Sequence, residues 1–168
     1  MKKIIIALLA LLPMAAMAQN VKFGHVDTQS IMQSMPEFIK ARGEVEAESK
    51  QYENELMAMQ KELQDKAEAY DKNKATMNAT TQQQTEDELQ QMYQKIQQAY
   101  QDNQQKIQKS TQDKLQPISL KLQNAIKAVG KNGGYVYIMD TAAGIPYVSE
   151  TLSKDVTDDV KAELNKMK

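Results

Sequence analysis

Apolar residues recur along the middle of the chain at the spacing of a coiled coil. Val45, Tyr52 and Met59 lie seven residues apart, and the positions between and after them are filled by Leu56, Leu63, Tyr70 and Met77. Such spacing places one narrow apolar stripe on a helix, because the remaining positions are mostly Gln, Lys and Glu. The pattern therefore predicts a helix from Glu37 to about Met77 whose stripe faces a partner helix.

The same spacing resumes after a polar gap. Residues 73–84 are mostly Lys, Asn, Thr and Gln, and Thr85 followed by Glu88 has the signature of a capping box at a helix start. We expect the chain to reverse at a tip near 73–85 and to return as a helix over residues 86–129. The predicted hairpin seam comprises Tyr52, Leu56, Met59, Leu63, Tyr70, Leu89, Tyr93, Ile96, Tyr100 and Ile107.

Three polar residues interrupt this seam, namely Asn73, Asn103 and Lys114. Pro117 lies within the returning helix, where proline removes a backbone hydrogen bond and usually causes a kink. The apolar register also shifts near Pro117, which indicates that the helix leaves its hairpin partner there and packs against another element. We therefore expect an arm that is imperfectly sealed and able to flex.

Short β-type segments flank the predicted arm. Residues 21–27 are expected to form a strand, followed by a short helix capped by Thr28 or Ser30, and Pro36 suits the first turn of the long helix. Residues 135–140 predict a strand that is buried on both faces, and residues 145–149 predict a second strand that pairs with it as a hairpin edge. Thr157 is expected to cap a final helix.

Together these elements predict an α+β protein in which a long antiparallel helical hairpin is inserted into a small β-rich body. The expected domains are a signal peptide (1–18), the body (19–37 plus 118–168) and the arm (38–117). A core of about 70 residues is marginal, and an unpaired edge strand is a liability, so the body should oligomerise. The candidate oligomerisation residues are Val21, Phe23, His25, Tyr135, Tyr137, Ile138 and Tyr147.

The N-terminus has the features of a cleaved signal peptide. Lys2 and Lys3 precede an apolar run at residues 4–12, and Ala16-Met17-Ala18 provides small residues for cleavage after Ala18. Nine helical residues span only ~14 Å, which is too short for a hydrocarbon core of ~30 Å. We expect an exported protein without stable membrane insertion, located in the periplasm of a Gram-negative cell.

Composition excludes several kinds of chemistry. The chain has no cysteine and one histidine, His25, which we interpret as a packed strand residue. Without Lys2 and Lys3 it carries 19 basic and 22 acidic residues, so nothing favours nucleic acid. The sequence offers no set of acid, base and nucleophile. We therefore expect no catalytic, metal or cofactor-binding residues, no cofactor and no enzymatic activity.

A few small or apolar residues lie off the predicted seam. Two interpretations remain open: ordinary surface residues, or an adaptable apolar face that contacts a client, for which methionine is suited because it repacks easily. The possible client contacts are Met57, Met92, Ala58, Ala69, Ala99 and Met77.

The ordered set of segments resembles the Skp (OmpH-like) family of periplasmic chaperones over the whole mature chain. The resemblance rests on Phe23-Gly24-His25-Val26-Asp27, the long Gln/Lys/Glu-rich hairpin, Tyr137-Ile138-Met139-Asp140, Ile145-Pro146-Tyr147-Val148 and Asp155-Val156-Thr157-Asp158-Asp159-Val160. It implies a homotrimer in which three β-rich bodies form a central core and three hairpins enclose a cavity. It further implies an ATP-independent holdase that binds unfolded outer-membrane proteins there and prevents their aggregation.

The arm departs from the basic arms of the best-known family members. Residues 37–84 hold seven basic and ten acidic side chains, and residues 85–129 hold six and five. Charge steering and lipopolysaccharide binding are therefore not indicated, and apolar contact must supply more of the affinity for clients. The alternative hypothesis is a structural coiled-coil scaffold or spacer of the cell envelope, although a scaffold would favour a continuous, well-sealed seam.

Overall fold

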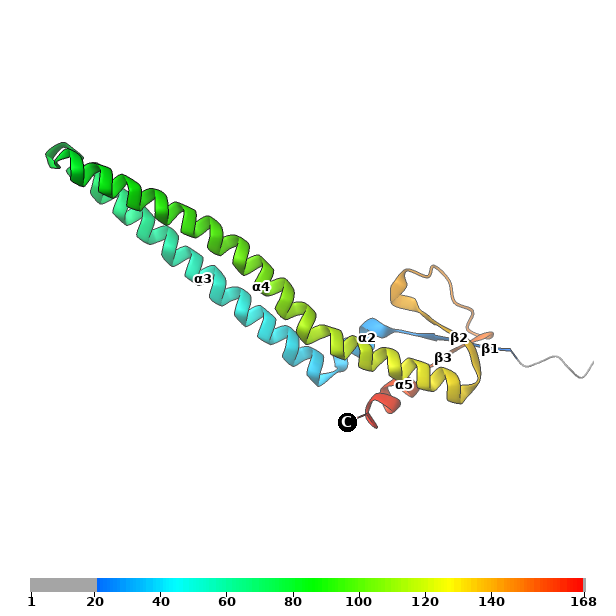
Figure 1. Ribbon diagram of the computed structural model, residues 1–168. Coiled ribbons are helices and arrows are strands. Elements are labelled where there is room, and N and C mark those ends of the chain that lie inside the picture. Colours follow the sequence, from blue (N-terminus) through cyan, green and yellow to red (C-terminus); the bar gives the residue numbers. More distant parts are fainter. Residues whose placement is uncertain (1–20, 168) are drawn as a thin grey trace, which may run out of the picture. The chain divides into compact units, whose positions relative to one another are not determined.

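The computed structural model describes residues 21–167, in which long helices are combined with a small sheet (Figure 1). This is the predicted α+β class. The expected signal peptide and its cleavage site after Ala18 lie outside the described residues. In chain order the elements are β1 (Lys22–Val26), α2 (Thr28–Ser34), α3 (Pro36–Asn73), η2 (Lys74–Thr76), α4 (Ala79–Gly133), β2 (Tyr135–Asp140), η3 (Thr141–Ala143), β3 (Ser153–Asp155) and α5 (Thr157–Leu164).

The described chain divides into two compact units. Residues 34–119 form one, which we call the hairpin unit. Residues 21–33 and 120–167 form the other, which we call the sheet unit. The sequence predicts domain boundaries at 37/38 and 117/118. Whether the domains so defined fold independently remains a prediction.

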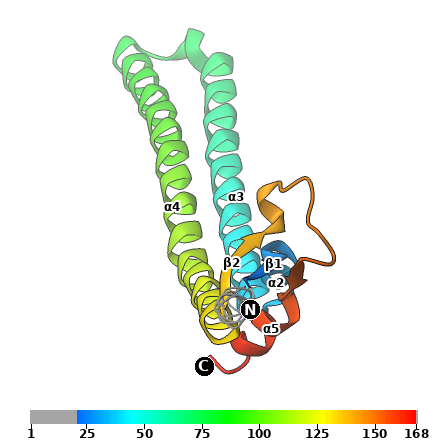
Figure 2. The ribbon, with the colours of Figure 1, turned by 90° about the vertical axis from the view of Figure 1, so that its right-hand side faces the viewer.

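The hairpin unit consists of α3 and the greater part of α4, which run antiparallel and side by side (Figures 1 and 2). Pro36 occupies the first turn of α3, as predicted, since its fixed φ angle and missing N–H suit that position. The 38 residues of α3 extend over ~57 Å at 1.5 Å per residue. Helix α4 continues through Pro117 to Gly133.

The chain reverses over a shorter segment than the sequence predicts. Helix α3 ends at Asn73, the 3₁₀ turn at 74–76 follows, and α4 already begins at Ala79. The prediction of a cap at Thr85 is therefore wrong. The cap is Asn78, whose Oδ1 accepts a hydrogen bond from the Thr81 N–H at 2.9 Å. Thr85 lies inside the helix and donates to the Thr81 carbonyl at 2.9 Å.

The sheet unit contains three parallel strands in the order β2-β1-β3. The predicted β-hairpin is wrong, because residues 145–149 form no strand. The third strand is instead Ser153–Asp155, which pairs with β1 through Phe23, Gly24 and His25. A longer connection than a hairpin turn lies between β2 and β3, since β3 must run parallel to β1 on the side away from β2.

The core of the sheet unit lies on one face of the sheet, where α2, α5 and the end of α4 contribute buried side chains. Gly24 and Val26 are the buried residues of β1 on this face, whereas Phe23 and His25 point to the opposite face. Its buried side chains include Val26, Ile31, Leu122, Ala125, Val156, Val160 and Leu164.

Two caps in this unit differ from the predicted ones. Helix α2 is capped by Asp27, whose Oδ1 accepts from the Ser30 N–H at 2.8 Å, rather than by Thr28 or Ser30. Thr157 is the first residue of α5 and does not cap it, because the cap position is occupied by Val156.

Candidate functional site

The seam between α3 and α4 is only partly buried. Of the ten seam residues predicted from the sequence, Tyr70 and Ile96 are buried, with 6% and 7% of their surface exposed. Six others are half-buried, namely Tyr52, Leu56, Met59, Leu63, Leu89 and Ile107. Two thin helices that pack only against each other leave one side of each seam residue in water. The seam therefore holds the hairpin together with little apolar burial per residue.

The register of α4 differs from the predicted one at two tyrosines. Tyr93 and Tyr100 are 57% and 55% exposed, so they lie outside the seam. Met92 and Ala99, which the sequence placed off the seam, are half-buried between Leu89, Ile96 and Asn103 in a regular alternation of three and four residues. Leu89, Tyr93, Ile96, Tyr100 and Asn103 show an equally regular alternation, so spacing alone does not distinguish the two registers.

Polar contacts reinforce the hairpin next to its tip. The Tyr70 hydroxyl donates to Glu86 Oε1 at 2.5 Å, and the Lys66 ammonium is paired with the Glu88 carboxylate. The hydrogen bond to Glu86 raises the pKa of Tyr70 to about 12, with burial adding to the shift. The side-chain amide of Gln82 also donates to the carbonyls of Lys74 and Met77, at 2.9 and 3.2 Å. Apart from the polar composition of this segment, no sequence pattern predicts these contacts near the tip.

A second polar group lies at the other end of the hairpin unit. Lys114 Nζ is 2.6 Å from Glu44 Oε2 and 3.4 Å from Glu48 Oε1 on α3. The hydrogen bond from Lys114 lowers the pKa of Glu44, and the same bond raises the pKa of Lys114. Ser110 Oγ is buried without a hydrogen-bond partner, and Asn103 is buried in the same helix. The sequence predicts Lys114 as an interruption of the apolar seam, but its ion pairs link α4 to α3.

The predicted client-contact residues fall into two groups. Met57, Ala58 and Ala69 are exposed on α3, and 58% of the Met57 surface is accessible. Met77 is half-buried in the tip, and Met92 and Ala99 belong to the seam as described above. Ala58 also lines a shallow depression along α3 with Ala47, Lys50, Gln51, Asn54 and Glu55.

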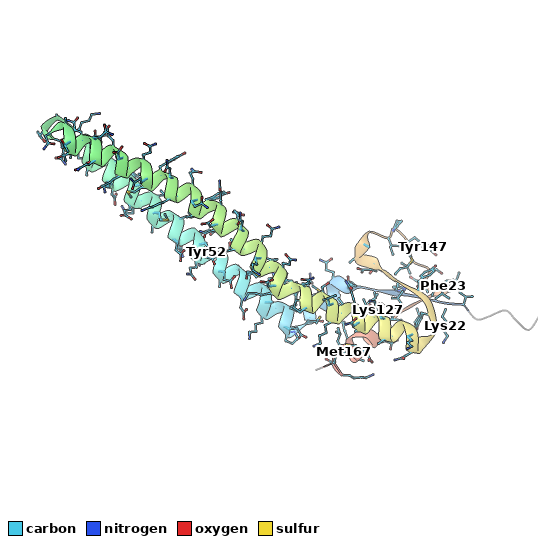
Figure 3. All side chains as sticks on the ribbon, viewed as in Figure 1. Lys22, Phe23, Tyr52, Lys127, Tyr147 and Met167 are labelled. Atoms are coloured by element: carbon cyan, nitrogen blue, oxygen red, sulfur yellow. The ribbon has the colours of Figure 1, made fainter. Side chains whose placement is uncertain are left out.

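The sheet unit has an open apolar face. Phe23 and Tyr137 lie on it with ring centroids 4.9 Å apart, and Met139 and His25 continue it. A recess of about 190 Å³ lies between this face and the connection from β2 to β3. Tyr147, on that connection, is 78% exposed, and Figure 3 labels it together with Phe23. His25 Nδ1 lies 2.9 Å from Ser153 Oγ, so its ring is held by β3.

The burial predicted for β2 is wrong, and the predicted oligomerisation residues of β1 and β2 lie on two different sides of the sheet. Strand β2 is not buried on both faces, because Val136, Tyr137 and Met139 are exposed. Tyr135 and Ile138 point away from the open face and pack against glycines: a Cβ on Gly24 would lie 3.2 Å from each of them. The open face therefore carries Phe23, His25, Tyr137 and Tyr147 of the predicted set, together with Met139.

Membrane-spanning helices and metal-binding groups are two further kinds of feature to consider within residues 21–167. No helix in this part of the chain is sufficiently long and apolar to cross a membrane. No group of three or more His, Cys, Asp or Glu side chains within the same residues is placed to hold a metal ion. The candidate sites described above are surfaces: the half-buried seam with its exposed flanks, and the open face of the sheet.

Comparisons with known proteins agree with this architecture. A family model described as outer membrane protein (OmpH-like) matches residues 22–164. The chaperone protein Skp of Yersinia enterocolitica is 29% identical over 150 residues, which cover 87% of each chain. The Skp of Yersinia pseudotuberculosis is 34% identical over 152 residues, or 90% of each chain.

A solved structure has the same fold. An OmpH-like protein from Caulobacter crescentus aligns with a TM-score of 0.74 at 20% identity, over 88% of this chain and 86% of the other. The family match covers both units, from β1 to the last residue of α5. This chain therefore belongs to the OmpH-like outer membrane protein family.

Proposed function

We propose that this protein is an ATP-independent periplasmic holdase that binds unfolded outer-membrane proteins and prevents their aggregation. The observation that carries the proposal is the membership of the family, whose relatives similar over about 90% of their length are named chaperone protein Skp. The expected signal peptide supports a location in the periplasm. The chaperone assignment also favours a binding protein over an enzyme.

The hairpin unit has surfaces suited to a non-native polypeptide. An unfolded β-barrel protein exposes short segments of alternating hydrophobicity, so a holdase must offer apolar contacts that do not require a defined partner shape. Tyr93, Tyr100 and Met57 offer exposed apolar surface beside the seam. Tyrosine contributes a large rigid ring with a polar end, and methionine repacks easily, so both adapt to varied partners.

The open face of the sheet unit supports self-association as a homotrimer. Phe23, Tyr137, Met139 and Tyr147 bring apolar surface together on one face of a small sheet. Monomeric proteins rarely leave a contiguous apolar patch of this kind in water. Subunit association would cover it and would place several hairpins around one space.

A refolding assay tests the function. A denatured outer-membrane β-barrel protein is diluted from urea with and without this protein, and light scattering is recorded. We expect suppression of scattering at near-stoichiometric ratios without added ATP. Light scattering coupled to size exclusion gives the subunit number of the same sample. If the protein forms stable oligomers and aggregation is unchanged, the envelope scaffold is favoured instead. A scaffold would be expected to have a continuous, well-sealed seam, whereas the contact between α3 and α4 is only half-buried.

A further inference from the structure

The seam between α3 and α4 is incompletely filled in the middle of the hairpin unit. A recess of about 130 Å³ is lined by Met59 and Glu62 of α3 and by Met92, Lys95 and Ile96 of α4. Met59, Met92 and Ile96 are the seam residues at this level, so the recess opens into the apolar contact between the helices. Both helices contribute to it, and it is therefore present only when the hairpin is closed.

The size of the recess selects what can enter it. An apolar cavity of ~150 Å³ admits one benzene molecule. The recess of about 130 Å³ is open to solvent on one side, and Glu62 and Lys95 contribute polar surface to it, but its volume has room for one aromatic ring and not for a segment of backbone. An entering group must therefore come from a chain that runs along the outside of the hairpin.

The lining favours an aromatic group. Methionine sulfur makes favourable contacts with aromatic rings, and the unbranched side chain can move to admit one. Here two methionines face the same space from opposite helices. Glu62 and Lys95 are exposed and carry opposite charges, so the rim attracts neither an acidic nor a basic group selectively. Tyr93, next to Met92, adds an exposed ring on the outside.

We propose that the Met59–Met92 recess receives one aromatic side chain of an unfolded outer-membrane β-barrel segment. The spanning strands of such proteins are ~10 residues of alternating hydrophobicity with aromatic residues at both membrane interfaces. An extended segment of this kind presents single aromatic side chains at intervals. The recess, which lies beside the exposed Tyr93, can hold one such side chain. This inference rests on the proposed holdase function and specifies where and how a client is held.

Methyl NMR of the full chain tests the inference directly. The protein is labelled at the methionine methyl groups, and Met59 and Met92 are assigned through Met59→Leu and Met92→Leu. The probe is a synthetic ten-residue strand peptide of alternating hydrophobicity with one terminal Phe, compared with the same peptide carrying Ala. We expect ring-current shifts at the Met59 and Met92 methyl groups with the Phe peptide only. Shifts equally large at the exposed Met57, or none at Met59 and Met92, would overturn the inference.

Binding of the same peptides provides a second measurement. The double variant Met59→Leu/Met92→Leu should bind the Phe peptide up to about tenfold more weakly, since sulfur–aromatic contacts contribute on this scale. Its affinity for the Ala peptide should not change. Met32→Leu, in α2, is the matched control and should bind both peptides as the parent does. If the double variant and the control bind the Phe peptide with equal affinity, the proposal that the recess holds an aromatic ring is contradicted.

The refolding assay separates the two proposals. Suppressed aggregation together with unchanged Met59 and Met92 signals would reject the recess and retain the holdase. Failure to suppress aggregation would reject the holdase, and with it the client that the recess is proposed to hold.

Discussion

The hydroxyl of Thr28 donates a hydrogen bond to the Asp140 carboxylate at 2.6 Å, which ties the start of α2 to the end of β2 across 112 positions of sequence. The same carboxylate accepts from the Thr28 and Ala142 N–H groups, at 3.4 and 3.0 Å. A neighbouring bond joins the Asp27 N–H to Thr157 Oγ1 at 3.1 Å. Side chains near the ends of the parallel strands thus accept hydrogen bonds from backbone N–H groups in the turns that follow these strands.

Replacing Thr28 by Val should destabilise the sheet unit by about 1–3 kcal/mol, because the Asp140 carboxylate loses a part-buried donor. Chemical denaturation followed by circular dichroism measures the change. Thr151→Val is the control, since Thr151 makes only an exposed contact with Ser149 at 3.3 Å. Equal stability of the two variants would show that the Thr28–Asp140 bond contributes nothing measurable.

Alanine at Gly133 and at Gly43 should have opposite effects. A Cβ on Gly133 would overlap the Tyr135 ring, so the ring or the helix end must shift, and we expect a loss of about 1–3 kcal/mol. A Cβ on Gly43 meets nothing within 4 Å inside α3. There alanine should add about 0.5–1 kcal/mol through its helix propensity. Denaturation curves of both variants provide the test, and a stabilising Gly133→Ala would contradict the packing described.

The Lys114 cluster should make the hairpin unit sensitive to acid. The pKa of Glu44 is lowered in the folded state, so its contribution is present above its ordinary pKa near 4.5 and is lost as the pH falls further. Lys114→Met removes this pairing and should reduce the fall in thermal midpoint between about pH 6 and pH 3. Lys109→Met, which removes an exposed pair within one helix, is the comparison. Parallel pH profiles of parent and Lys114→Met would exclude the cluster as a source of acid sensitivity.

The hydroxyl of Tyr70 should lose its proton only at unusually high pH. The bond to Glu86 raises the pKa of Tyr70 to about 12, so Tyr70 favours the folded state below about pH 10 and loses this effect as the pH rises toward 12. Ultraviolet absorption of the phenolate records the titration. Tyr70→Phe should remove the late component and leave the rest unchanged, whereas Tyr93→Phe should leave the late component in place. A late component that persists in Tyr70→Phe would assign it to another residue.

Binding of an unfolded outer-membrane protein should depend only weakly on salt. The hairpin helices carry nearly balanced charge, with 11 basic and 15 acidic side chains over residues 34–119. Screening by salt therefore has little long-range attraction to remove, while apolar contacts remain. Affinity measured by fluorescence between about 50 and 300 mM salt gives the slope. A loss of tenfold or more over this range would indicate that charge, rather than apolar contact, holds the client.

Local patterns in the sequence determined the helices and the central strands of this protein. The heptad stripe predicts α3 and α4, Pro36 marks the start of α3, and the apolar runs at 22–26 and 135–140 predict β1 and β2. These features depend on residues close together in the chain, whose spacing decides which face can be buried. The same patterns, together with the order of the segments along the chain, were sufficient to suggest the family.

Only the tertiary structure decided which neighbours those elements take. Residues 145–149 have strand-forming residues, yet β1 pairs instead with Ser153–Asp155, because a parallel partner needs a connection longer than a hairpin turn. Tyr93 and Tyr100 fit a seam almost as well as Met92 and Ala99, and the partner helix selects the methionine and the alanine. Strand pairing and seam register depend on contacts between distant residues, and a local pattern compatible with two partners cannot choose between them.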